Sequence, residues 1–122
     1  MQMINSVYSD VERGRKLNKL IRSVYKYKPE FGLFLITLPL EDGALLEVYN
    51  YNVFLQPYFL ERDDEIVVVG ITKSKGSANE LLRKITEDSL RVTGGLDIKK
   101  YINDNFDLIV LPKKRAKKAK KN

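Results

Sequence analysis

Cysteine and histidine are both absent from this 122-residue chain. Without cysteine it can form no disulfide, no thiolate zinc site and no thiol nucleophile. Without histidine it lacks the commonest general base, the commonest nitrogen ligand for metals and the side chain that titrates near neutral pH. An enzyme would have to use Asp, Glu, Lys, Tyr or Ser, and no constellation of these stands out. We therefore predict a protein that is not an enzyme and that holds no metal or other cofactor.

Long hydrophobic runs are also absent. No stretch approaches the roughly 20 apolar residues that a membrane span needs, and the first six residues lack the charged start and apolar core of a signal peptide. We expect no membrane span, and the lack of cysteine favours a cytoplasmic location. With 43% hydrophobic residues, the chain is long enough to bury a core without disulfides or metals.

Acidic residues are missing from the end of the chain. The net charge is +6, yet residues 1–111 hold 15 basic against 16 acidic side chains. The excess charge therefore lies in residues 112–122. Because like charges repel and this segment has no apolar face, we predict a disordered basic tail after a single domain over 1–111. The basic residues of the tail are Lys113, Lys114, Arg115, Lys117, Lys118, Lys120 and Lys121.

Residues 65–92 form the unit around which we expect the rest of the chain to be arranged. The β-branched run at 66–69 predicts the most buried strand of the sheet, flanked by partners on both sides. An amphipathic helix follows, with capping-box spacing at Ser77 and Glu80 and an end marked by Gly94.

Further strands and helices are predicted on both sides of this unit. Residues 31–40 and 44–51 are joined by a turn signal, so they should pair as antiparallel strands. Pro57 bars the next apolar stretch from a central position in the sheet. A short helix at 98–104 and a last strand within 106–111 complete the pattern.

The first helix is predicted to start near Ser9, where Ser9 and Glu12 have capping-box spacing. Its apolar residues recur on one face at helical spacing. Its opposite face is basic and carries Arg15, Lys19, Arg22 and Lys26.

These elements predict an α+β fold in the order α-β-β-β-α-α, with an optional final strand. The sheet should have three or four antiparallel strands with helices packed on one face, leaving the other face partly open. Tyr49 and Tyr51 would share a strand face in an aromatic-rich segment. Such a face could stack bases, but the RNA-recognition signature is absent, and core packing or a dimer interface explains it as well.

Two loop regions could also carry chemistry. Residues 73–77 join a strand to a helix N-terminus, and they are either an anion site or an ordinary polar connection. They are not a P-loop, because Gly76 is followed directly by Ser77. The acidic residues in 41–47 and 61–65 match no calcium loop and are interpreted as solvated turns.

The charge distribution points to an anionic partner. The tail could contact nucleic-acid phosphates or anionic lipid, could act as a nuclear localisation signal, which it resembles, or could simply aid solubility. We favour weak nucleic-acid binding with little sequence preference, in which the tail supplies most of the affinity and the basic face of the first helix orients it. The alternative is a protein-interaction or regulatory module, which could be a homodimer through the aromatic sheet face.

Overall fold

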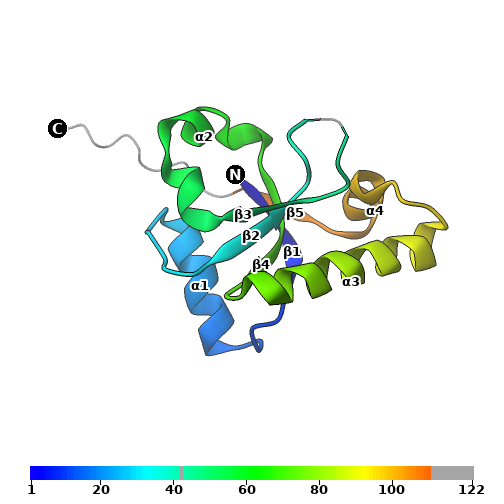
Figure 1. Cartoon of the computed structure of the whole chain (residues 1–122), viewed down its shortest axis with the longest axis horizontal. Coiled ribbons are helices and arrows are strands. Elements are labelled where there is room, and N and C mark those ends of the chain that lie inside the picture. Colours follow the sequence, from blue (N-terminus) through cyan, green and yellow to red (C-terminus); the bar gives the residue numbers. More distant parts are fainter. Residues whose placement is uncertain (42, 111–122) are drawn as a thin grey trace.

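The computed structural model describes residues 1–41 and 43–110, which form an α+β fold around a five-stranded sheet (Figure 1). The predicted α+β class is therefore confirmed. The strand order is β3-β2-β4-β1-β5. The strands are β1 (Gln2–Ser9), β2 (Phe34–Thr37), β3 (Glu47–Asn50), β4 (Val67–Thr72) and β5 (Leu108–Val110). The α-helices are α1 (Arg15–Tyr25), α2 (Pro57–Glu61), α3 (Lys75–Thr93) and α4 (Ile98–Asn105), with 3-10 turns η1 (Tyr51–Leu55) and η2 (Asp63–Glu65).

Strand β4 is the central strand that the β-branched run predicts. It pairs with β2 on one side and with β1 on the other. Val68, Val69 and Ile71 are fully buried. Branched side chains fit the pleated surface of a strand that is covered on both faces, which explains the continuous apolar run.

The number and direction of the strands differ from the prediction of three or four antiparallel strands. Strand β1 extends the sheet and runs parallel to β4, while its other neighbour, β5, is antiparallel. The sequence does not predict β1, because Asn5 and Ser6 interrupt the alternation of apolar and polar residues that marks a strand. Both residues are exposed, at the point where the pairing of β1 with β4 is irregular. The optional final strand is confirmed as β5.

The starts of two helices also differ from the prediction. Ser9 ends β1, and its Oγ accepts a hydrogen bond from the Val11 amide, so α1 begins only after Gly14. The Oγ of Ser74 accepts from the Ser77 amide at 3.2 Å and caps α3. Both predicted capping boxes are therefore wrong, because nearby hydroxyl groups make other local contacts.

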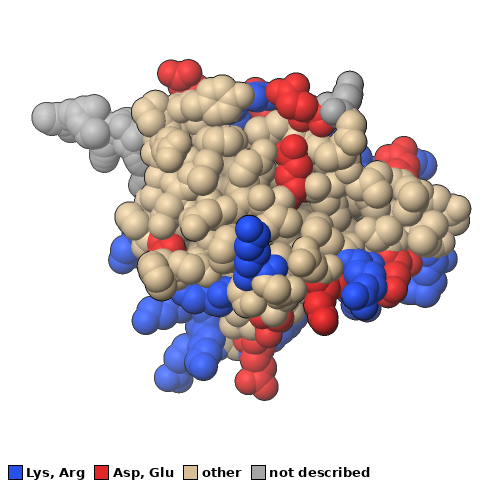
Figure 2. Space-filling view, in the orientation of Figure 1, with Lys and Arg blue, Asp and Glu red and all other residues tan. Residues whose placement is uncertain are grey.

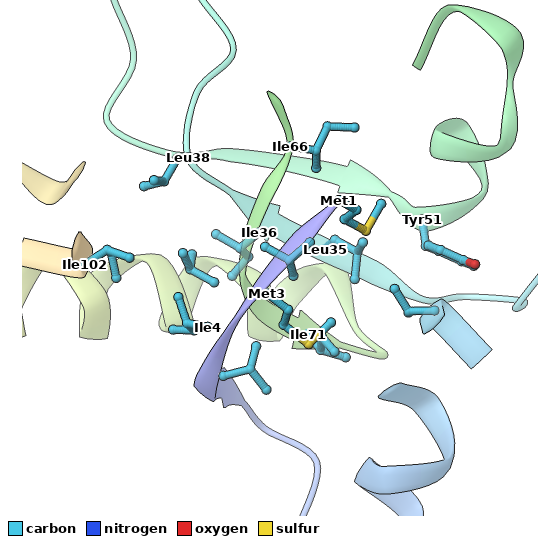
Figure 3. Packing of buried hydrophobic residues seen from close by; sticks show 14 of the residues in the cluster. Met1, Met3, Ile4, Leu35, Ile36, Leu38, Tyr51, Ile66, Ile71 and Ile102 are labelled. Atoms are coloured by element: carbon cyan, nitrogen blue, oxygen red, sulfur yellow. The ribbon is translucent and has the colours of Figure 1, made fainter. Parts of the chain in front are cut away.

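Both faces of the sheet are covered at its central strands, which differs from the predicted partly open face. Leu35 and Ile36 are neighbours in β2 and point to opposite faces, yet both are fully buried. Helix α3 contacts β1, β2 and β4, and side chains from several elements converge in the core (Figure 3). In the two described ranges, no helix has the length and apolar content needed to cross a membrane.

Candidate nucleic-acid interface

Helix α1 separates a buried apolar stripe from a basic surface. Leu17 and Val24 are buried in the core. The opposite side consists of Arg15, Lys19, Arg22 and Lys26, and all four are exposed. We call these four residues the α1 basic face. Figure 2 shows basic side chains gathered over α1, at the lower left of the view.

Part of this face borders a shallow hollow of about 150 Å³. We call it the basic hollow, and its lining residues are Lys19, Arg22, Ser23, Lys26 and Lys28. None of these four cations forms an ion pair with another described residue. Four cations with no acid between them create a local positive potential that attracts anions.

The turn after α1 brings Lys28 into the hollow. Tyr27 has a positive φ of 56°, and the Lys28 amide folds back to donate to the carbonyl of Ser23 at 2.9 Å. A left-handed tyrosine is uncommon, and surrounding contacts must hold it in place. The hydroxyl of Tyr27 supplies such contacts, because it donates to both carboxylate oxygens of Asp63 at 2.8 and 2.9 Å.

Hydroxyl groups also engage the acids that lie nearest this turn. Ser23 Oγ donates to Glu30 at 2.6 Å. Asp63 is buried and forms an ion pair with the N-terminal amine of Met1. Asp63 is thus held inside the protein, and no acidic residue lines the basic hollow.

Several basic residues elsewhere, by contrast, are paired. Arg62 contacts Glu41 and Glu65, and its hydrogen bonds to Glu65 and Tyr58 raise its pKa. Lys84 and Arg91 both contact Asp88. Burial acts to raise the pKa of Asp88, but the hydrogen bonds from Tyr8 and Arg91 and the two nearby cations lower it overall. A phosphate bound at those cations would have to displace a carboxylate, whereas on α1 it would not.

A second hollow, of about 530 Å³, adjoins the α1 basic face and has mixed charge. Its cations are Lys16, Lys19 and Lys73, and its acids are Asp10, Glu12 and Glu30. We call it the middle hollow.

The loop over 73–77, which the sequence suggests as an anion site, uses its polar groups within the fold. Thr72 Oγ1 accepts from the Ser74 amide and donates to the Ser74 carbonyl, and Lys73 Nζ donates to the carbonyl of Phe31 at 2.7 Å. This arrangement is typical of a polar connection with a helix cap.

The aromatic residues do not form an open sheet face. Tyr51 lies in η1 and is fully buried, because the chain leaves the sheet after Asn50. Tyr49 is half-buried and packs edge-on against Phe54 and Phe59 at 5.0 and 5.5 Å. The prediction that Tyr49 and Tyr51 share a strand face is therefore wrong, whereas the predicted alternative of core packing accounts for both.

The tail residues lie outside the described residues. These are Lys113, Lys114, Arg115, Lys117, Lys118, Lys120 and Lys121. The structure thus places only the α1 half of the predicted site. It adds Lys28, which sequence periodicity could not find because Lys28 lies beyond the helix and depends on the turn at Tyr27.

The acidic residues show no shared site. Within the described ranges, Asp and Glu side chains form no group of three placed to hold a metal ion. Glu47 instead accepts from the Leu40 amide and from the hydroxyl of Tyr49.

Comparison of the chain with protein-family models, curated proteins and solved structures gives no match.

Proposed function

We propose that this protein is a non-enzymatic, cytoplasmic accessory domain that binds nucleic-acid phosphates weakly and with little sequence preference. The α1 basic face and the C-terminal tail would contact the backbone together. The observation that carries the proposal is the basic hollow, a depression lined by four exposed cations and by no acidic residue. The absence of cysteine supports the cytoplasm as the location.

The helix gives these cations a fixed arrangement. Eleven residues of α1 span about 16 Å at 1.5 Å per residue, so its cations can meet several phosphates of one strand. Phosphate binding releases condensed counterions, and the affinity should therefore fall steeply as salt rises. Little sequence preference is expected, because phosphate contacts position a protein without reading bases.

A charge-matched pair of variants tests this proposal. Lys19→Gln, Arg22→Gln and Lys26→Gln together remove three charges from the basic hollow. Lys75→Gln, Arg83→Gln and Lys99→Gln remove the same charges from exposed positions on α3 and α4. Fluorescence anisotropy titrations with duplex DNA at several salt concentrations give the slope of log affinity against log salt concentration. Only in the α1 variant should this slope become smaller in magnitude, by about 3 for three lost phosphate contacts at roughly 0.9 each. Equal losses in both variants would show that net charge alone drives binding.

The alternative function, a protein-interaction module, has support from β5 and not from the aromatic segment. Leu108, Ile109 and Val110 lie on a strand at the end of the strand order and are 37%, 42% and 73% exposed. Apolar edge strands can pair with a strand of another chain. Sedimentation across a concentration series tests this, and Ile109→Lys should weaken any self-association that it reveals.

A further inference from the structure

A larger cleft lies between the end of β1 and the first turns of α3. Here the cleft has a volume of about 570 Å³, within the usual range for ligand sites.

The lining of this β1–α3 cleft differs in character from the basic hollow. Its two cations, Arg13 and Lys84, are matched by two acids, Asp10 and Glu80. Its lining also includes the aromatic residues Tyr8 and Phe106, together with Leu81 and three serines. Balanced charge gives no general preference for phosphate, whereas rings and hydrogen-bonding groups suit a flat, polar heterocycle.

Partly buried contacts hold Tyr8 and Phe106 in place. The hydroxyl of Tyr8 donates to Asp88 at 2.6 Å and lies 2.9 Å from the hydroxyl of Tyr101. Phe106 packs against both tyrosines, with ring centroids 6.1 Å from Tyr8 and 5.8 Å from Tyr101. A ring fixed in this way loses little conformational entropy when a ligand stacks on it.

The cleft adjoins the proposed phosphate surface through the middle hollow. Asp10 lines both the cleft and the middle hollow, and Lys19 lines both the middle hollow and the basic hollow. The three depressions therefore lie one after another between the cations of α1 and the aromatic residues Tyr8 and Phe106.

We propose that the ligand is single-stranded nucleic acid, with its phosphates along the α1 basic face and one base stacked against Phe106 in the β1–α3 cleft. This inference rests on the proposed function and adds a binding site for a base. A base within a duplex is already paired and stacked, so only a single strand can place one in the cleft.

The test compares a single-stranded DNA oligonucleotide with a strand of the same length that carries deoxyribose and phosphate but no bases. Wild-type protein should bind the base-containing strand about tenfold more tightly, the effect expected of one stacked base. Phe106→Leu should remove most of this difference and leave the affinity for duplex DNA unchanged. Phe59→Leu is the matched control, because Phe59 is also half-buried and packs edge-on against tyrosine.

A second measurement needs no variant. When 2-aminopurine replaces successive bases of the single strand, one position should lose fluorescence on binding wild-type protein, because stacking quenches the base. Unchanged fluorescence at every position, or equal affinity for the strands with and without bases, would overturn the inference while the proposed function stands. Failure to bind either single strand while duplex DNA still binds would also overturn the inference alone. Failure to bind duplex DNA as well would overturn the proposed function itself, and the inference with it.

Discussion

The hydroxyl of Tyr27 donates to both carboxylate oxygens of Asp63, across 36 residues of sequence. Asp63 is only 2% exposed and also pairs with the amine of Met1. This one carboxylate therefore holds together the turn after α1, the segment before β4 and the start of β1. Because the turn places Lys28 in the basic hollow, the proposed binding surface depends on a buried contact.

Asp63→Asn should destabilise the fold by about 3–5 kcal/mol, because it leaves a buried amine without its counter-charge. Urea denaturation measures this change. Glu61→Gln, a similar loss of charge at an exposed position of α2, should change stability by no more than about 0.5 kcal/mol. Similar small effects in both variants would show that the buried pair contributes little.

Gly70→Ala should destabilise the protein by about 1–3 kcal/mol, the usual cost of overpacking a core. Gly70 lies on β4, and its pairing partner Ile36 lies on the neighbouring strand β2. A Cβ at Gly70 would lie 2.9 Å from Cδ1 and 3.1 Å from Cβ of Ile36. Ile36→Val removes the nearer contact, so in a double-mutant cycle it should reduce the cost of Gly70→Ala. Gly95→Ala is the control, because a Cβ there meets no atom within 4 Å.

The sequence predicts β4 and the α1 basic face because each rests on a strong local pattern. A β-branched run predicts β4, and helical periodicity with basic residues opposite apolar ones predicts the α1 basic face. Other features depend on contacts between distant segments. Asp63 lies in an acidic stretch that is typical of a solvated turn, and nothing local shows that Met1 and Tyr27 reach it.

Strand β1 and the cleft beside it were missed for a similar reason. Asn5 and Ser6 break the alternation of β1, and its parallel partner, β4, lies more than 50 residues away in sequence. Without β1 the cleft beside α3 lacks one of its walls, and the sequence therefore predicts no cleft there. Tyr8 and Phe106 become neighbours only through the packing of β1, α3 and α4.

Stability should fall as the pH rises above 10, and Tyr49 should contribute to this loss. Burial, followed by the hydrogen bond to Glu47, raises the pKa of Tyr49 from 10.0 to about 12. The unfolded chain therefore releases this proton at lower pH than the folded protein, which favours unfolding between pH 10 and about 12. The contribution is fully present below pH 10.

Tyr49→Phe should make this alkaline loss of stability shallower. Urea midpoints measured from neutral pH to about pH 12 would show the difference. Part of the loss should remain in the variant, because burial also raises the pKa of Tyr8 and Tyr51. A pH dependence identical to that of the wild type would mean that Tyr49 ionises alike in the folded and unfolded states.

Truncation after Leu111 should separate the tail from the rest of the proposed interface. It removes seven basic residues and no acid, and leaves a chain with 15 basic and 16 acidic side chains. If most of the tail engages duplex DNA, a plot of log affinity against log salt concentration should have a slope of about −6 for the full-length protein, at roughly −0.9 per phosphate contact. The truncated form should lose most of the affinity, because its overall charge repels the ligand.

Folding should survive this truncation, because residues 112–122 contain no apolar residue larger than alanine, apart from Pro112, with which to pack. Thermal denaturation of both forms provides this control. Fluorescence titrations across a salt series then show where binding resides. If the truncated form binds as tightly as the full chain, the site lies in the body of the protein, and the α1 basic face becomes its first candidate. If neither form binds at any salt concentration, the phosphate-binding function is wrong, and the exposed apolar residues of β5 make protein interaction the better hypothesis.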